Sequence, residues 1–337
     1  MQFWDRYNVI KKIPTFFRMI GVYALLHFLV DGLCVCCLYL MSPFLGIASL
    51  TGLFITYNVL AFLSQPLTGM VADKVRNKHW VLLAAMSLLT MAVLCAALSV
   101  AFYANPLAVH AMMTAAVLLG VGNSLFHVWG GKLTAVRSGN DIRALGLFVS
   151  TGAFGLAVAI VFCSWVMLFG FLLAICCVAV LYLQSDKLLV EKTPDTVFGS
   201  SKKFRYSHAA VRVAMVALMG LVLFRSYIGE SFSAGIPKGS AFVLAIGAVS
   251  MLGKMAGGWL AERWGIIHAM VFVLVAVLIC LLFRDAQWYV PLVGLFMVNC
   301  TMPVTLYLAN TVLEGKEGLA FGLLAAALMP GYLLAVL

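Results

Sequence analysis

Long apolar stretches separated by short polar segments dominate the pattern of this chain. About eleven stretches reach the roughly 20 apolar residues that a helix needs to cross a lipid bilayer. They lie near positions 16–40, 48–71, 79–102, 106–129, 143–162, 164–183, 209–229, 240–261, 267–283, 287–310 and 318–337. The run over 143–183 is too long for one span, so we divide it at 163–165. Short alternating segments typical of membrane β-barrels do not occur. The pattern therefore predicts an all-α integral membrane protein.

The composition excludes several function classes. Apolar residues make up 64% of the 337 residues and charged residues only 10%, against about 45–50% and 25% in soluble domains. So little charge cannot cover a water-facing surface, which excludes a soluble enzyme and a nucleic-acid-binding domain. The sequence also has no phosphate-binding loop and no hydrolase or metalloprotease motif. We expect a protein that is not an enzyme, carries no cofactor and has no nucleic-acid partner.

The position of the basic residues indicates how the chain crosses the membrane. With eleven spans, 18 of the 22 Lys and Arg residues fall on the side of the N-terminus and two, Lys238 and Arg284, on the other. Loops rich in Lys and Arg face the cytoplasm. The pattern thus predicts a protein of the cytoplasmic (inner or plasma) membrane. Its N-terminus is expected to lie in the cytoplasm. Most of the net charge of +10 is therefore explained by basic residues on the cytoplasmic side.

The longest polar segment, 184–208, divides the chain into a half of six spans (1–183) and a half of five (209–337). We expect this segment to be a cytoplasmic linker. Each half carries a similar short motif after its second span. The first copy comprises Gly69, Asp73, Lys74 and Lys78, and the second comprises Gly258, Glu262, Arg263 and Gly265. Parallel repeats of this kind are a transporter architecture.

These motifs resemble the signature of the major facilitator superfamily, Gly-x-x-x-Asp-Arg/Lys-x-Gly-Arg/Lys-Arg/Lys between spans 2 and 3. Arg76 and Asn77 depart from it, and Glu262 replaces the second Asp. The resemblance implies two pseudo-symmetric six-helix halves that expose a central cavity to each side in turn. It also implies that the motif residues close a cytoplasmic gate. The family has twelve spans and eleven are visible here. Either the twelfth span is lacking or the natural chain is longer.

A narrower resemblance lies in spans 1 and 4. Residues 27–31, and 120–127 followed by two glycines, are similar to the fosmidomycin-resistance-like branch of the superfamily. That branch implies proton-driven efflux of small molecules. The matching part of span 5, 150–155, lacks the Gly-Pro of antiporters. A membrane sensor or assembly subunit on the same fold therefore stays open as an alternative.

Ionisable residues inside spans are costly and are functional candidates. His27 and Asp31 lie four residues apart in span 1 and share a helix face. We predict that they form a coupling site that loads and releases a proton. A structural His–Asp pair that locks span 1 to a neighbour is the alternative.

Two basic residues lie inside spans of the second half, Arg225 in span 7 and Lys254 in span 8. With Asp31 as the one near-central acid, they favour a small anionic or polar organic substrate. An ion pair between Asp31 and Arg225 and an outward-reaching Arg225 are alternatives. We name four further candidates for substrate contact: Asn123, His127, Asn299 and Thr301.

Sulfur-containing residues leave one further alternative. Two pairs, Met215 with Met219 and Met251 with Met255, each share a helix face and could pass copper or another soft metal. The nine cysteines all fall within spans, where disulfides are not expected. We predict no metal site. The expected partners are a small-molecule substrate, protons and the lipid bilayer, with the chain acting as a monomer.

Overall fold

The computed structural model describes residues 2–190 and 207–336, with side chains over 19–185 and 207–335. Almost every described residue is helical. In chain order the elements are α1 (Gln2–Met41), the 3-10 helix η1 (Ser42–Phe44), α2 (Ile47–Asn58), the π-helix η2 (Val59–Leu63), α3 (Gln65–Lys74), α4 (Lys78–Ala101), α5 (Ala108–Ser138), α6 (Ile142–Phe162), α7 (Trp165–Val190), α8 (His208–Ala234), α9 (Ser240–Trp264), α10 (Ile266–Leu282), α11 (Val290–Asn299), α12 (Met302–Val312), α13 (Glu317–Ala326) and α14 (Leu328–Val336).

The predicted all-α membrane fold is confirmed. Within the described ranges, nine helical segments are long and apolar enough to cross a membrane, and a bent pair in span 2 makes ten. The shorter apolar helix α10 lies where the remaining expected span falls. The chain also divides near 163–165 as predicted, because α6 ends at Phe162 and α7 begins at Trp165.

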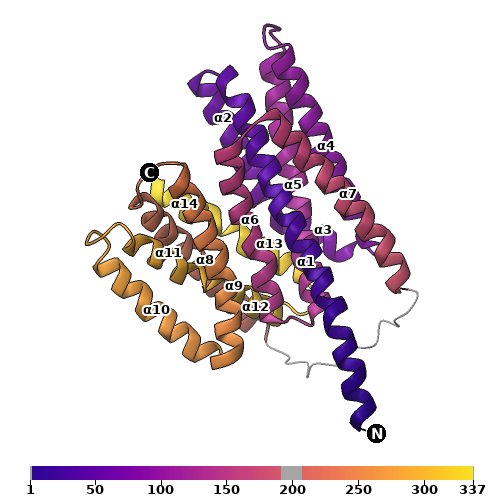
Figure 1. The fold of residues 1–337 in the computed structure, drawn as a ribbon, viewed down its shortest axis with the longest axis vertical. Coiled ribbons are helices and arrows are strands. Elements are labelled where there is room, and N and C mark those ends of the chain that lie inside the picture. Colours follow the sequence, from indigo (N-terminus) through magenta and orange to yellow (C-terminus); the bar gives the residue numbers. More distant parts are fainter. Residues whose placement is uncertain (1, 191–206, 337) are drawn as a thin grey trace.

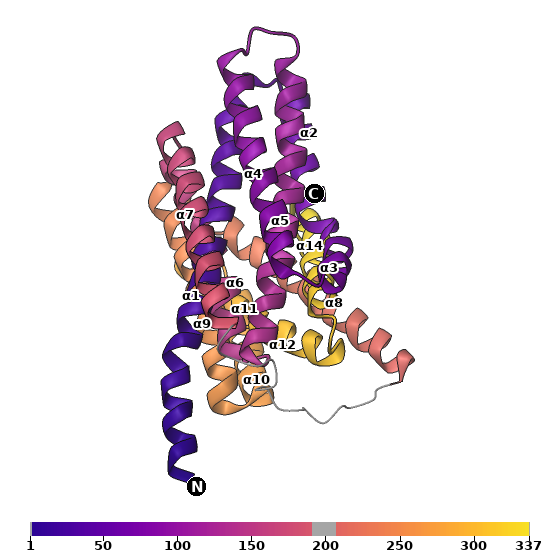
Figure 2. The ribbon, with the colours of Figure 1, turned by 90° about the vertical axis from the view of Figure 1, so that its right-hand side faces the viewer.

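The helices of the first and second halves occupy neighbouring regions (Figure 1). The main contacts between these regions are α6 packed along α9 and α3 packed along α13, and α5 also touches α13 while α6 also touches α12. Most of the predicted linker, residues 191–206, lies outside the described residues. The view turned by 90° shows α4 and α5 side by side over much of their length, with α1 running beyond the bundle at its N-terminal end (Figure 2).

Two spans are interrupted inside the bundle. Span 2 bends by 40° between η2 and α3, where Pro66 enters the first turn of α3. Proline has no N–H to donate, and a π-helical turn widens the helix, so both devices break a regular span. Span 10 divides between α11 and α12 just before Pro303, where proline interrupts the helical hydrogen bonds. Broken helices at membrane depth are tolerated where protein surrounds them.

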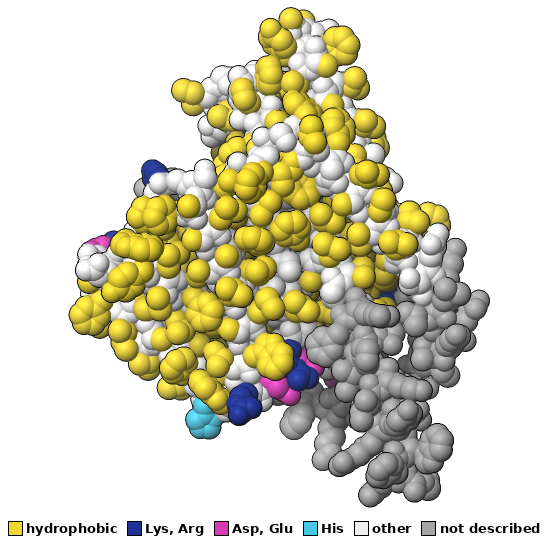
Figure 3. Space-filling model, in the orientation of Figure 1, with side chains coloured by type: hydrophobic (Ala, Val, Ile, Leu, Met, Phe, Trp, Pro, Cys, Tyr) yellow, Lys and Arg dark blue, Asp and Glu magenta, His cyan; other side chains and the backbone are white. Residues whose placement is uncertain are grey.

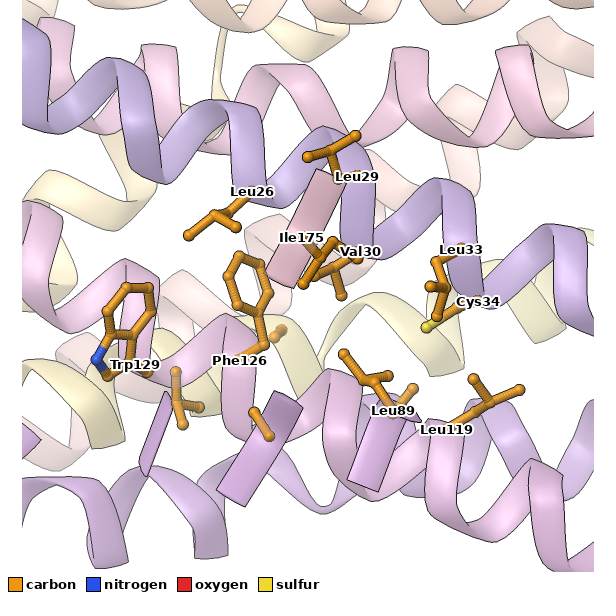
Figure 4. Close-up of a cluster of buried hydrophobic side chains, with 14 of the residues drawn as sticks. Leu26, Leu29, Val30, Leu33, Cys34, Leu89, Leu119, Phe126, Trp129 and Ile175 are labelled. Carbon is orange, nitrogen blue, oxygen red and sulfur yellow. The ribbon is translucent and has the colours of Figure 1, made fainter. Parts of the chain in front are cut away.

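Apolar packing fills the first half. Leu26, Val30 and Leu33 of α1 meet Phe126 of α5 and Ile175 of α7 in a buried cluster (Figure 4). The outside of the molecule is apolar as well, and charged side chains show only near the margins of the face in Figure 3. Large exposed apolar side chains are abundant. Such a surface is stable against lipid rather than water, so the chain is an integral membrane protein.

Candidate functional site

Two histidines and one carboxylate meet between α1 and α5. The Nε2 atoms of His27 and His127 lie 2.9 Å apart. The Asp31 carboxylate places one oxygen 3.3 Å from His27 Nε2 and the other 3.4 Å from His127 Nε2. The Nδ2 amide of Asn123 donates to an Asp31 oxygen at 3.2 Å. We call His27, Asp31 and His127 the histidine–aspartate cluster.

Helix periodicity explains this convergence. His27 and Asp31 are four residues apart on α1, and Asn123 and His127 are four apart on α5, so each pair occupies one helix face. The two faces oppose each other. Each histidine also contacts a backbone carbonyl through Nδ1: His27 contacts Phe148 at 2.6 Å, and His127 contacts Asn123 at 2.9 Å. Since a carbonyl can only accept, each Nδ1 carries the hydrogen and each Nε2 points into the cluster.

A glycine of α6 allows this arrangement. A Cβ atom on Gly152 would collide with the Asp31 carboxylate and the His27 ring. The side chains of the cluster are largely buried, with exposed fractions of 7% for His27 and 13% for Asp31 and His127. Sequence reasoning missed Gly152 as a site residue, although it lies in the very stretch of span 5 that departs from the antiporter pattern.

The two in-span bases line a separate cavity in the second half. This cavity has a volume of about 230 Å³. Its lining comprises Arg225, Ser226, Gly229, Glu230, Ser233, Ser250, Lys254, Leu295, Val298, Asn299, Met302 and Leu328. None of the histidine–aspartate cluster belongs to it. We call it the Arg–Lys cavity.

Arg225 is the most unusual residue of the Arg–Lys cavity. It is only 9% exposed, and its Nε is buried without a hydrogen-bond partner. Among the described residues, neither Arg225 nor Lys254 has a salt bridge or a side-chain hydrogen bond. In particular, Asp31 faces the two histidines and not Arg225. A buried guanidinium normally has an anionic partner, because its charge is costly to bury alone.

The other predicted substrate residues divide between the two sites. Asn299 lines the Arg–Lys cavity, although its amide also donates to the Leu295 carbonyl. Thr301 is not in the lining, and its hydroxyl donates to the Val298 carbonyl at 2.7 Å. Asn123 and His127 lie in the histidine–aspartate cluster. The structure therefore does not bring the four candidates together.

The first motif copy contacts the second half of the chain. The Asp73 carboxylate accepts the backbone N–H groups of Gly318 and Leu319, both at 2.9 Å. These amides open α13, whose N-cap residue Lys316 provides no side-chain cap. Asp73 therefore caps α13 from α3, and its charge also complements the helix dipole. Lys132 of α5 approaches Asp73 to 3.3 Å.

Close backbone contact accompanies this cap. A Cβ on Gly69 would overlap the Gly318 carbonyl, and one on Gly322 would overlap the Gln65 carbonyl. The motif glycine thus lets α3 and α13 touch. Lys74 is exposed and Lys78 is half-buried. The two halves are closed against each other at this end of the bundle.

The second motif copy has a different environment. Gly258 is buried, and a Cβ there would meet the Ile142 carbonyl at the start of α6. Glu262 and Arg263 are exposed, and Gly265 adopts a positive φ of 80°. The start of α6 is instead capped by Asp141, which accepts the Arg143 and Ala144 amides.

Asp141 is held in its charged form. Burial alone would raise the pKa of Asp141, but hydrogen bonds and the charge of Arg143 outweigh this and lower it. The closest of these contacts joins Arg143 Nη2 to the carboxylate at 2.6 Å. The cap of α6 is therefore local to its own half, unlike the cap of α13.

Sequence reasoning also missed an amide contact at the same end. Asn310 of α12 donates to the side-chain oxygen of Asn140 at 3.0 Å, and Asn140 donates to the Tyr307 carbonyl at 3.1 Å. Asn140 adopts a φ of 62°, a left-handed conformation that Asn tolerates better than most residues. This turn adds a second polar contact between the halves.

Replacing Asp73 by Asn is expected to slow conformational cycling more than it weakens substrate binding. Asn offers one acceptor oxygen and no charge for two amides, so the α13 cap weakens by about 1–2 kcal/mol. That shifts the equilibrium between open and closed states by about 5- to 30-fold. Turnover and equilibrium binding measured on the same preparation check this. A change in affinity alone would contradict the gate role.

Comparison with solved structures shows the fold. The chain is similar to a variant of the Escherichia coli fucose:proton symporter, with 14% identity, a TM-score of 0.62, and coverage of 95% of this chain and 90% of that one. It is also similar to a bacterial homologue of the iron transporter ferroportin in an outward-facing state, with 15% identity, a TM-score of 0.60 and coverage of 94% and 90%. The chain therefore has the fold of the major facilitator superfamily transporters.

No narrower group of transporters is identified by these similarities. A second structure of the fucose symporter, in the outward conformation, matches with 15% identity and a TM-score of 0.59 over 93% of this chain and 89% of that one. No family model matches the chain, and no curated protein matches it in sequence. The similarity to the fosmidomycin-resistance-like branch stays a prediction.

Proposed function

We propose that the chain is a secondary active transporter that moves a small anionic or polar organic solute by alternating access. The observation that carries this proposal is the buried, unpartnered Arg225 beside Lys254 in the Arg–Lys cavity. The protein lies in the cytoplasmic membrane with its N-terminus in the cytoplasm, acts as a monomer and is not an enzyme.

The charges of the cavity favour a negatively charged group on the solute. Arg225 and Lys254 supply two positive charges, while Glu230 is the one acid in the lining. Charged side chains at membrane depth are rare and mark substrate or ion pathways. Ser226, Ser250 and Asn299 add neutral hydrogen-bonding groups. A carboxylate or phosphate would satisfy the guanidinium, and the neutral groups would hold hydroxyl or amide groups of the same molecule.

Transport against a gradient needs a second site for a driving cation. The Asp31 carboxylate is suited to this role because it lies inside a span yet outside the Arg–Lys cavity. The sequence pattern favours the proton as that cation and His27 as the partner of Asp31, and we retain both in the proposal. The resemblance to an efflux branch suggests export as the direction of transport.

The contacts around Asp73 support a gate at one end of the bundle. With Asp73 bound to the start of α13 and Gly69 against Gly318, the end of the bundle that we assign to the cytoplasm is closed. Opening that end requires α3 and α13 to separate. The other motif residues, Lys74, Lys78, Gly258, Glu262, Arg263 and Gly265, would act at the same end.

The test is solute flux into proteoliposomes with Arg225→Gln, Lys254→Gln and the double variant. Losing a hydrogen bond to a charged group costs about 1.5–3 kcal/mol, so each single variant should bind an anionic solute about 10- to 100-fold more weakly. A panel of organic anions, neutral solutes and cations is measured with and without an imposed pH gradient. Anion transport should fall while that of neutral solutes stays closer to the wild type.

Lys238→Gln is the matched control, because Lys238 is an exposed base outside the cavity. It should leave flux unchanged. Anion transport that is unaffected in the double variant would contradict the solute class. An absence of flux for every class, together with a stable protein partner on purification, would instead favour the non-transporting alternative.

A further inference from the structure

We infer that His27, Asp31 and His127 form a binding site for one divalent first-row transition-metal ion. The histidine–aspartate cluster is the one group of His, Cys, Asp and Glu side chains, among the described residues, that is compact enough for such an ion. This metal site is separate from the Arg–Lys cavity. Metal binding does not rest on the proposed function, in which the same carboxylate loads a proton, and the ion and the proton would compete for it.

The spacing of the donor atoms of these three residues matches a coordination shell. Histidine nitrogens and carboxylate oxygens bind zinc at about 2.0–2.2 Å, so neighbouring ligands at right-angled to tetrahedral geometry lie about 2.9–3.5 Å apart. The two Nε2 atoms are separated by 2.9 Å. The distances from the Asp31 oxygens to these nitrogens are 3.3 and 3.4 Å. The two Asp31 distances belong to different oxygens, so the carboxylate would bind the ion through both oxygens. All three separations fall within the range for ligands around one small ion.

The hydrogen bonds of the rings support the same conclusion. Both Nδ1 atoms donate to carbonyls, of Phe148 and Asn123, so both Nε2 atoms turn toward each other. Two neutral rings in this arrangement would place two lone pairs face to face, which is repulsive unless a proton or a metal ion lies between them. Metal-binding histidines characteristically donate their second ring N–H to a carbonyl or carboxylate. The cluster shows this pattern twice.

The carboxylate is oriented in a similar way. The Asn123 amide donates to Asp31 at 3.2 Å, which fixes the carboxylate beside the rings. Ligating carboxylates are commonly held by such outer hydrogen bonds. Gly152 leaves the space above Asp31 and His27 free of a side chain. The site therefore has three ligands and an outer shell that orients each of them.

The ligand types indicate the class of ion. Two imidazoles and one carboxylate suit divalent Mn, Fe, Co and Zn, while soft thiolates and thioethers select Cu(I). The thiol of Cys34 contacts the Asn123 amide at 3.6 Å and so belongs to the outer shell. Three protein ligands leave positions open for water, which suits an ion that must bind and leave. The small exposed fractions of the ligands would admit an ion but exclude the organic solute.

The experiment measures metal binding by the purified full chain after treatment with a chelator. Calorimetric titration with Zn²⁺ should show one ion per chain, and Co²⁺ should give absorption bands typical of nitrogen and oxygen ligands. Asp31→Asn and His127→Gln should each weaken binding by about 100-fold or more, and Asn123→Leu by about tenfold, as expected for ligand and outer-shell changes.

His110→Gln and His268→Gln serve as controls, because both histidines are exposed and lie outside the cluster. They should bind Zn²⁺ like the wild type. Thermal unfolding without metal shows whether each variant is folded. If His127→Gln is unfolded, X-ray absorption of the Co²⁺-loaded wild type still tests for two imidazole ligands.

Two results would overturn the inference: no stoichiometric binding by the wild type, or binding that Asp31→Asn and His127→Gln leave unchanged. A different result would contradict the proposed function. Metal binding without solute flux would contradict the transporter proposal alone. Flux driven by a pH gradient in a protein that binds no metal would overturn the metal site alone.

Discussion

Asp31→Asn is expected to abolish accumulation of the solute against its gradient while leaving downhill exchange measurable. Asn is close in size to Asp, so α1 and α5 can still pack. It cannot carry a negative charge, however, and the two facing histidine nitrogens lose the carboxylate that lies within 3.4 Å of both. Without that charge the cluster cannot hold a cation against the cost of burying it. Accumulation should fall to the level of protein-free vesicles.

Counterflow and gradient-driven uptake in the same proteoliposomes check this result. Asp285→Asn is the matched control, because Asp285 is 87% exposed and pairs with the neighbouring Arg284. It should accumulate solute like the wild type. Accumulation by Asp31→Asn at the wild-type level would exclude the cluster as the coupling site, whichever cation is involved.

Gly69→Val is expected to open the end of the bundle that Asp73 closes. A side chain at position 69 would overlap the Gly318 carbonyl, so α3 and α13 cannot keep their contact. Overpacking of a tight interface costs about 1–3 kcal/mol, which shifts a two-state equilibrium by about 5- to 150-fold. Transport should fall strongly, because the protein remains mainly in one state.

The measurement uses a cysteine introduced on the face of α13 that packs against α3. A membrane-impermeant thiol reagent is added on the side of the membrane that holds the N-terminus, and the rate of labelling is followed. Labelling should be faster in Gly69→Val than in the wild type. Gly170→Val is the control, because a Cβ atom on Gly170 of α7 would meet no heavy atom within 4 Å. Equal labelling rates in both variants would show that the Gly69 contact does not close this end.

Much of the fold could be predicted because membrane helices carry a strong local signal. The division between α6 and α7 and the break before Pro303 follow from the length of the apolar runs and from proline chemistry. The bend of span 2 follows from the sequence only in part, through Pro66 in the first turn of α3. It also depends on the π-helical turn at 59–63, which has no simple signature in residue type.

The site was only partly predictable. Helix periodicity correctly placed His27 and Asp31 on one face, because both belong to one helix. The contact of His127 with that pair depends on how α5 is turned and shifted against α1. Such rotation is set by packing across many residues. For the same reason the sequence grouped Asn123 and His127 with Arg225, although the cavity lining separates them.

The unequal caps of α6 and α13 have a consequence for dynamics. Asp141 stays with α6 whatever the two halves do, but α13 depends on Asp73 from the opposite half. In the proposed transport cycle, the amides of Gly318 and Leu319 would lose their partner and exchange with solvent each time the halves separate. The rate of deuterium uptake at these two amides, compared with the rate at Arg143 and Ala144, therefore measures how often the proposed gate opens. No added label is needed.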